Sequence, residues 1–300
     1  MYKLIAIDID GTLLKNDKTI SKENYLAIEK AKAKGINIVL STGRPIQGAE
    51  KYSIKLNLTS NTNYAVAYSG ALVQCLGNKE ILFESILTHD NIKFLYALSQ
   101  KLNITLNAAT ANSLLTPTLN LTTQVESFLS NLPVKIVDFN DLSKYPIIYR
   151  VVYLNETQPF IKKIKTLLKN TNIKYNILDT LNRNDDLFYH KNNLPSELYN
   201  KFTVFKPSSN TLEILNKGIN KGTGVEVIAH KLGIHSEEVI CIGDSENDID
   251  MIKYAGLGVA MGNASLDVKK AADYVTFTNE ENGLAHVINK FILKEEEKAV

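Results

Sequence analysis

Short apolar runs alternate with helical patterns at both ends of this 300-residue chain. Each run is of strand length, and the stretches between the runs place apolar residues at helical spacing. The expected strands cover residues 4–7, 36–40, 64–68, 239–242, 257–261 and 274–275. Strands separated by helices are joined by right-handed crossovers, which gives a parallel sheet covered by helices on both faces. The sequence therefore predicts an α/β fold built on a doubly wound parallel sheet.

The middle third of the chain differs from the two ends in composition and in the pattern of its apolar residues. It is rich in Asn and Thr, and an alternating strand is expected at 147–153. Two further stretches, 90–102 and 157–168, have helical periodicity. We expect this segment to form a separate α+β module inserted into the α/β domain. The predicted domains are 1–83 plus 208–300 for the core and 84–207 for the insertion.

The charge and composition of the chain disfavour several classes of partner. Its 34 Lys and Arg residues balance 32 Asp and Glu residues, so it lacks the positive field that draws proteins onto nucleic acid or anionic lipid. No apolar stretch approaches the roughly 18 residues of a membrane span, and the start Met1-Tyr2-Lys3 is unlike a signal peptide. Cys75 and Cys241 lie in apolar runs, which is typical of buried, reduced thiols. We expect a cytoplasmic protein with no nucleic-acid or membrane partner.

A pair of aspartates follows the first expected strand, in the motif Asp8-Ile9-Asp10-Gly11-Thr12. Residues two apart in an extended strand share a face, so the side chains of Asp8 and Asp10 project together at its end. Two close carboxylates repel each other, which suits a nucleophile paired with a proton shuttle, or a cation site. Gly11 permits the turn by which the chain leaves the sheet. A plain strand end followed by a turn is the alternative.

Three more polar clusters follow expected strands or open expected helices. The motif Ser41-Thr42-Gly43-Arg44-Pro45 offers a hydroxyl and a guanidinium at a strand-to-helix turn, which suits an anion cradle or a simple helix cap. Lys221 stands just before a helix, where a solvated surface residue is the alternative. In Gly243-Asp244-Ser245-Glu246-Asn247-Asp248, polar residues at i, i+3 and i+4 share one helical face. Ligands bind beyond the carboxyl ends of strands in such sheets, so we expect all clusters to meet in one crevice.

Four carboxylates would then lie together: Asp8, Asp10, Asp244 and Asp248. Left bare, this cluster would repel itself. A hard divalent cation resolves the repulsion, and oxygen-only ligands point to Mg²⁺ rather than Zn²⁺. Lys221 and Arg44 supply further positive charge. Phosphoryl transfer requires such carboxylates, cations and a metal ion, because its catalysis consists mostly of positioning and charge stabilisation.

Taken together, the motifs resemble those of the haloacid dehalogenase superfamily, and specifically its Cof-type branch of small-molecule phosphatases. The Asp8–Thr12 motif is similar to the first family motif and Ser41–Pro45 to the second. Lys221 is similar to the third motif, and the Gly243–Asp248 motif to the fourth. The resemblance covers the whole chain and extends to segments typical of sugar phosphatases. It implies a Rossmann-like core with an inserted α/β cap of the C2 type, which closes over the site and reads the leaving group.

The resemblance also implies a role for each motif residue. Asp8 would attack phosphorus, while Asp10 would protonate the leaving oxygen and later activate water. The phosphoryl oxygens would be held by Thr42 and Lys221. Further contacts to phosphate or substrate would come from Gly11, Thr12, Gly43, Arg44 and Asn247. The Mg²⁺ ligands would be Asp8, the backbone carbonyl of Asp10, and Asp244, with Asp248 as a further ligand or close beside them.

The predicted function is that of a Mg²⁺-dependent hydrolase of phosphomonoesters, acting on small phosphorylated metabolites such as sugar phosphates. Two alternatives share parts of this pattern: a phosphomutase of the same fold, and a phosphate-sensing regulator that does not turn over. The chain departs from the branch at Ser69, where Asn is usual. His89 and His190 flank the insertion without metal-ligand spacing. The expected state is a monomer or a small homo-oligomer.

Overall fold

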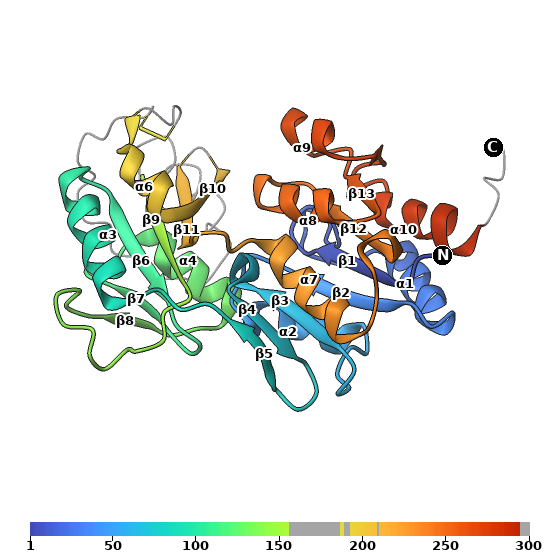
Figure 1. The fold of residues 1–300 in the computed structure, drawn as a ribbon, viewed down its shortest axis with the longest axis horizontal. Helices are drawn as coiled ribbons and strands as arrows, with labels where there is room; N and C mark the ends of the chain where they lie inside the picture. The colour runs from blue at the N-terminus through green and yellow to red at the C-terminus, as the bar shows by residue number, and fades with distance from the viewer. Residues whose placement is uncertain (156–186, 189–192, 209, 295–300) are drawn as a thin grey trace. The chain divides into compact units, whose positions relative to one another are not determined.

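A computed structural model of the chain describes residues 1–155, 187–188, 193–208 and 210–294. The helix expected at 157–168 and the side chain of His190 lie outside these residues. The chain divides into two compact units, the first formed by Met1–Glu84 with Ile219–Val300 and the second by Ser85–Gly218 (Figure 1). Each unit has its own sheet and its own apolar core.

The sheet of the first unit contains eight strands in the order β14-β13-β12-β1-β2-β3-β4-β5. Every neighbouring pair from β14 to β3 is parallel, and β4 and β5 extend the sheet in antiparallel fashion. The strands span Leu4–Asp8 (β1), Asn37–Ser41 (β2), Tyr64–Ala67 (β3), Leu72–Cys75 (β4), Ile81–Glu84 (β5), Val239–Gly243 (β12), Leu257–Ala260 (β13) and Tyr274–Val275 (β14). The predicted α/β fold with a parallel sheet is confirmed.

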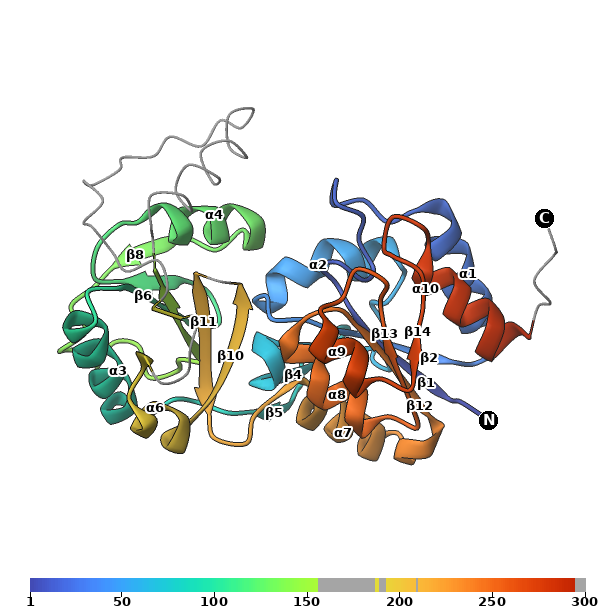
Figure 2. The ribbon, with the colours of Figure 1, turned by 90° about the horizontal axis from the view of Figure 1, so that it is seen from above.

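Helices cover both faces of this sheet (Figure 2). Successive residues of β1 point to opposite faces. Ile5 and Ile7 pack into a core with α1, α2 and α10, whereas Leu4 and Ala6 pack into a core with α7 and α8. The helices of the first unit span Lys22–Ala33 (α1), Ile46–Lys55 (α2), Lys221–Lys231 (α7), Ile249–Tyr254 (α8), Leu266–Ala271 (α9) and Gly283–Ile288 (α10).

The second unit contains a six-stranded sheet in the order β10-β11-β9-β6-β7-β8. Its strands span Thr105–Ala109 (β6), Leu114–Thr116 (β7), Val134–Ile136 (β8), Arg150–Leu154 (β9), Phe202–Ser208 (β10) and Thr211–Asn216 (β11). Its described helices span His89–Lys101 (α3), Leu121–Ser130 (α4) and Ser196–Lys201 (α6). Side chains of α3 and α6 share an apolar core with one face of the sheet. None of the helices described in either unit is long and apolar enough to cross a membrane.

The chain returns to the first unit later than the sequence analysis expected. The prediction placed the return at residue 208, whereas the structure places it after Gly218. The physical reason is strand β11, which pairs in antiparallel fashion with both β9 and β10. Residues 202–216 therefore form a hairpin within the sheet of the second unit.

A buried ion network ties helix α4 to the sheet of the second unit. Arg150 of β9 donates to the carboxylate of Glu213 on β11 at 2.7 Å, and also to Glu126 of α4. The amide of Asn107 on β6 donates to Glu126 as well, at 3.3 Å. Arg150, Glu213 and Asn107 are all buried. Charge pairing therefore adds to apolar packing in holding α4 on the sheet.

Candidate active site

The order of the strands brings the polar motifs to one edge of the first sheet. Strands β12, β1, β2 and β3 are consecutive neighbours and run parallel, so their carboxyl ends lie at the same edge. Asp8 is the last residue of β1, and Asp244 directly follows β12. Thr42 directly follows β2, and the turn Tyr68–Gly70 directly follows β3. The structure thus brings together segments that are far apart in the sequence.

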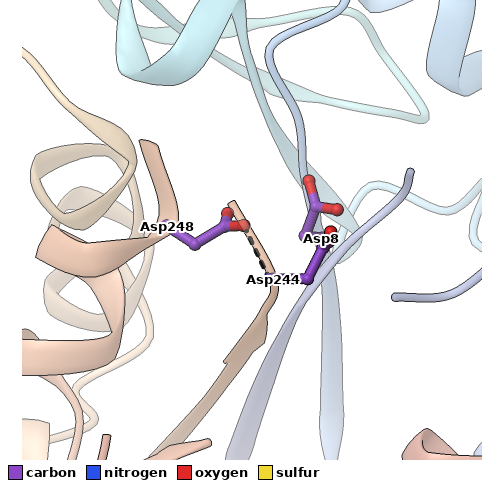
Figure 3. A group of neighbouring side chains, drawn as sticks. All are labelled: Asp8, Asp244 and Asp248. Carbon is purple, nitrogen blue, oxygen red and sulfur yellow. Dashed lines mark hydrogen bonds between the residues drawn. The ribbon is translucent and has the colours of Figure 1, made fainter. Parts of the chain in front are cut away.

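Three carboxylates meet at this edge: Asp8, Asp244 and Asp248 (Figure 3). Each can offer an oxygen atom within 4.8 Å of the others. The Asp248 carboxylate is fixed by the backbone, because its Oδ2 accepts from the N–H groups of Asp244 at 3.0 Å and Ser245 at 2.9 Å. The Oδ2 atom of Asp8 is buried and has no hydrogen-bond partner among the described residues. A buried, unpartnered carboxylate oxygen indicates a position for a ligand.

Lys221 lies between two of these carboxylates. Its Nζ donates to Oδ1 of Asp8 and to Oδ1 of Asp248, each at 2.6 Å, and its side chain is 1% exposed. Burial alone would lower the pKa of Lys221, but the charges of Asp248 and Asp8 raise it above its usual range, so Lys221 is a cation. Burial raises the pKa of Asp8, and the charge of Lys221 opposes this only in part.

This charge balance suits a divalent cation. When all three carboxylates are ionised, they outnumber the single ammonium of Lys221 and leave an excess of two negative charges in a buried site. The donor set contains only oxygen atoms, which hard cations such as Mg²⁺ prefer. Lys221 contacts only Oδ1 of Asp8, so the buried Oδ2, which has no hydrogen-bond partner among the described residues, is left to face a ligand. The residues present therefore fit a bound divalent metal ion.

The Asp244 carboxylate is held by neutral donors. Thr12 Oγ1 donates to its Oδ1 at 3.0 Å, and the Asn263 amide lies 3.5 Å from its Oδ2. Burial, assisted by the negative charge of Asp248, raises the pKa of Asp244 to about 7. Gly11 packs against this carboxylate at φ +85°, and a Cβ there would lie 2.4 Å from Oδ2 of Asp244. The turn after β1 therefore requires glycine at this position.

The Asp10 carboxylate lies outside the carboxylate cluster and is paired with cations. Arg44 donates to it in bidentate fashion, through Nε and Nη2, each at 2.6 Å. Lys18 donates to it at 2.9 Å. Burial would raise the pKa of Asp10, but the hydrogen bonds and charge of Arg44, with those of Lys18, lower it overall. The assignment of the Asp10 backbone carbonyl to a metal ion stays a prediction.

The loop after β2 is anchored to the turn after β3. The N–H of Ser69 donates to the carbonyl of Thr42 at 3.0 Å, and the N–H of Tyr68 donates to the carbonyl of Arg44 at 3.0 Å. The buried Thr42 hydroxyl accepts from the backbone N–H of Arg44 at 3.1 Å, and a hydroxyl that accepts in this way can still donate its own proton. Gly43 lies between these two residues.

The turn Tyr68–Gly70 also contacts the side chain of Asn247, through Ser69. Its Nδ2 donates to Oγ of Ser69 at 3.0 Å, and its Oδ1 is buried with no partner among the described residues. Asn247 belongs to the one-turn helix Glu246–Asp248, in which Asp248 contacts Lys221. Two side chains of the fourth motif therefore make contacts here: Asp248 contacts Lys221, and Asn247 contacts Ser69.

Two residues near the motifs were missed by the sequence analysis. Asn263 donates to the carbonyl of Gly11 at 2.9 Å and lies beside Asp244. It comes three residues after an apolar strand, so the rule that singled out the other clusters could have found it. Lys18, which pairs with Asp10, carries no such signal, because its position depends on the conformation of the loop that follows the first motif.

Comparison with known proteins gives matches along almost the whole chain. The sequence matches the profile of the haloacid dehalogenase-like hydrolases over residues 5–288. It is 36% identical over 295 residues to the protein named "Putative phosphatase YxeH" of Bacillus subtilis, covering 98% of this chain and 99% of that protein. It is 32% identical over 291 residues to 5-amino-6-(5-phospho-D-ribitylamino)uracil phosphatase YcsE of Bacillus subtilis, covering 97% and 96%. A solved structure of a haloacid dehalogenase-like hydrolase from Bacteroides thetaiotaomicron is similar, with a TM-score of 0.73, 29% identity and coverage of 97% and 99%.

The sequence and structural matches agree with the resemblance found in the motifs. The family profile covers both units rather than the first alone. Both of these relatives are named phosphatases, and they match this chain over nearly their full length. The chain therefore belongs to the haloacid dehalogenase-like hydrolases and is an enzyme of the phosphatase class.

Proposed function

We propose that the enzyme is a Mg²⁺-dependent phosphomonoester hydrolase that works through an aspartyl-phosphate on Asp8. The observation that carries this proposal is the buried, unpartnered Oδ2 of Asp8, beside a cationic Lys221 and two further carboxylates. A carboxylate oxygen in that setting is available as a nucleophile toward phosphorus. The charge of Lys221 favours the ionised, attacking form of Asp8 and opposes in part the effect of burial on the pKa of this carboxyl.

The proposed reaction has two steps. An Asp8 oxygen forms a bond to phosphorus while the bond from phosphorus to the leaving oxygen breaks, and Asp10, which has to enter this step as the carboxylic acid, gives that oxygen its proton and becomes the carboxylate. Water then attacks phosphorus, Asp10 takes a proton from the water, and the bond from Asp8 to phosphorus breaks. The pairing of Asp10 with Arg44 and Lys18 favours its carboxylate, which is the form that the second step needs.

The remaining motif residues would bind the phosphoryl group and the metal ion. Lys221 and the Thr42 hydroxyl would hold phosphoryl oxygens, with Asn247 close by. Asp8, Asp244 and Asp248 would hold Mg²⁺, with the Asp10 carbonyl as a further ligand. A bound Mg²⁺ would neutralise these carboxylates and stabilise the negative charge of the phosphoryl oxygens. Gly11, Thr12, Gly43 and Arg44 would shape the loops around the phosphate.

For the substrate we propose small phosphorylated metabolites, with sugar phosphates first. YcsE, at 32% identity, is named a 5-amino-6-(5-phospho-D-ribitylamino)uracil phosphatase, and the phosphate of that compound is carried by a ribityl chain. We propose that the second unit, Ser85–Gly218, acts as the cap that selects the leaving group. A cytoplasmic location and a monomeric or small homo-oligomeric state complete the proposal, and the buried free thiols Cys75 and Cys241 suit a reducing compartment.

The test is a phosphate-release assay with the purified full-length protein and Mg²⁺. The substrate panel contains sugar phosphates, pyridoxal phosphate, flavin mononucleotide and nucleotides. We expect free phosphate from at least one sugar phosphate, reversible loss of release with EDTA, and acid-stable label from a ³²P-labelled substrate on wild-type protein but not on Asp8→Asn. Isomerisation of a hexose 1-phosphate without free phosphate would instead support a phosphomutase. An Asp8→Asn variant that keeps more than about a hundredth of the wild-type rate would overturn the nucleophile assignment.

A further inference from the structure

We propose that Ser69 is a positioning residue that orients the side-chain amide of Asn247 for the phosphoryl group. The inference rests on the proposed function and adds a residue that the motifs do not assign. The Ser69 hydroxyl and the Asn247 amide are joined by a 3.0 Å hydrogen bond between residues 178 positions apart. Both side chains are buried, so solvent does not compete for this contact.

The backbone at Ser69 is in an unfavourable conformation. Ser69 has φ 50° and ψ 34°, and the preceding residue, Tyr68, has φ 49°. Left-handed backbone is uncommon for residues other than glycine and costs on the order of 1–3 kcal/mol at each position. Two such residues in succession, both fully buried, persist only where the surrounding structure requires them. Strain of this kind is concentrated at functional sites.

The turn that carries this strain contacts three of the predicted site segments. The N–H of Ser69 donates to the Thr42 carbonyl, and its hydroxyl accepts from Asn247. The next residue, Gly70, packs so closely on the residue before Lys221 that a Cβ would lie 2.0 Å from the carbonyl oxygen of Asn220. Ser69 thus stands between the loop after β2, the start of α7 and the fourth motif. Its conformation sets the distances between them.

The hydroxyl of Ser69 can either accept a hydrogen bond from the Asn247 amide or donate one to it. The amide now donates to Ser69, which leaves its buried Oδ1 without a partner in the described part of the chain. A phosphoryl oxygen accepts hydrogen bonds and cannot donate, so it requires Nδ2 of Asn247 rather than Oδ1. When the amide turns to present Nδ2, its Oδ1 comes to face Ser69. A hydroxyl can then donate instead of accept, so Ser69 supports both orientations.

The experiment compares Ser69→Gly and Ser69→Ala with the wild-type enzyme. Glycine removes the hydroxyl and relieves the left-handed strain, so Ser69→Gly is expected to fold with an unchanged or higher melting temperature. We expect kcat/KM for p-nitrophenyl phosphate, and affinity for inorganic phosphate in the presence of Mg²⁺, to fall about tenfold in both variants, equivalent to about 1.4 kcal/mol. Ser53→Ala is the matched control, because it removes a buried hydroxyl that donates to the Glu50 carbonyl within α2. It should leave both measurements unchanged.

A double-mutant cycle with Asn247→Ala separates positioning from a general structural effect. If Ser69 acts through Asn247, Ser69→Gly should lower phosphate affinity by less than about twofold in the Asn247→Ala background. Fully multiplicative losses, or Ser69→Gly affinity equal to wild type, would overturn the inference. Phosphate binding is measured separately from turnover. If the enzyme releases no phosphate from any substrate, the proposed function is refuted, and the binding data still test the inference about Ser69.

Discussion

At the level of single residues, Lys221 holds two carboxylates that would otherwise repel each other. Its ammonium contacts Asp8 and Asp248 in a site where the three side chains are almost entirely buried. Buried ion pairs of this kind contribute little when intact, because desolvation offsets the attraction. Removing one partner is costly, because the remaining charges stay buried and uncompensated. The metal-free enzyme therefore depends on Lys221 for stability as well as for the proposed chemistry.

Lys221→Met should destabilise the metal-free enzyme by about 3–5 kcal/mol, since it leaves buried carboxylates without their cation. Added Mg²⁺ should recover part of this loss by supplying positive charge to the same carboxylates. Chemical denaturation with and without Mg²⁺ measures both effects. The control is Lys270→Met, whose partner Asp267 and own side chain are mostly exposed, and which should change stability little. Equal effects of the two substitutions would contradict the role given to Lys221.

The raised pKa of Asp244 gives a pH dependence with a defined sign. In the metal-free protein Asp244 titrates near pH 7, well above its ordinary value of 3.8. Between these values the folded state holds a proton that the unfolded state has lost, so the contribution of Asp244 to stability is present at low pH and is lost as pH rises through about 7. A bound cation favours the ionised carboxylate and reverses this loss.

We therefore expect Mg²⁺ to raise the melting temperature more at pH 8 than at pH 5.5, since ligand ionisation no longer opposes binding at the higher pH. Thermal unfolding at a fixed Mg²⁺ concentration across this range tests the prediction. Asp244→Asn should flatten the pH dependence, because the amide does not titrate. A Mg²⁺ effect that is the same at both pH values would argue against Asp244 as a metal ligand.

At the level of elements, the turn after β1 controls where the Asp244 carboxylate can lie. Gly11 has φ +85°, and its α-carbon leaves no room for a side chain against Asp244. Gly35, in the turn after α1, has a similar φ of +80° but nothing within 4 Å of an added Cβ. The two glycines therefore share a backbone requirement and differ only in their surroundings.

Gly11→Ala and Gly35→Ala form a matched pair. Each should lose about 1–2 kcal/mol of stability from left-handed strain. Only Gly11→Ala should also displace Asp244, and we expect it to lower kcat/KM and Mg²⁺ affinity by at least about tenfold, or about 1.4 kcal/mol. Denaturation, turnover and Mg²⁺ titration of both variants provide the comparison. Similar activity in the two variants would show that the close contact at Gly11 is unimportant.

The elements were predictable from the sequence where their signals are local. The strand runs, and the positions of the first, second and fourth motifs at strand ends, follow from short segments. The cap of α1 is equally local, because the Ser21 hydroxyl accepts from the N–H of Asn24 three residues later. Contacts made over long separations were not predictable in this way. The bond from Asn263 to Gly11 spans 252 residues, and the left-handed backbone at Ser69 has no counterpart in residue pattern.

At the level of the whole molecule, each unit combines apolar packing with buried ion pairs, which Lys221 forms in the first unit and Arg150 in the second. The first unit has apolar cores on both faces of its sheet. The second unit has an apolar core together with the buried network of Arg150, Glu213 and Glu126. The second unit ends at Gly218, eleven residues beyond the predicted end of the insertion at residue 207, because the hairpin of β10 and β11 belongs to the inserted sheet.

Arg150→Met should lower the stability of the second unit by about 3–5 kcal/mol, since two carboxylates then lose their shared guanidinium. Inorganic phosphate should bind the variant with wild-type affinity at a temperature where both units are folded, because Glu213 and Glu126 belong to the second unit and the proposed phosphate-binding residues belong to the first. Calorimetric unfolding and phosphate titration measure these effects. Lys201→Met, which removes a half-exposed pair with Glu197, is the control and should change little. A stability equal to wild type would contradict this reading of the network.

The two junctions of the inserted unit have unequal tolerance to change in length. The first lies between Glu84 and Ser85, and Ser85 is 40 residues after Pro45, the last residue of the second motif. The second lies only two residues before Lys221, where Asn220 caps helix α7 through its side chain. Each residue turns a helix by about 100°. An insertion between Asn220 and Lys221 would therefore rotate Lys221 away from Asp8. We therefore expect a change of length between Glu84 and Ser85 to be tolerated better than one between Asn220 and Lys221, where the helix cap fixes the position of the lysine.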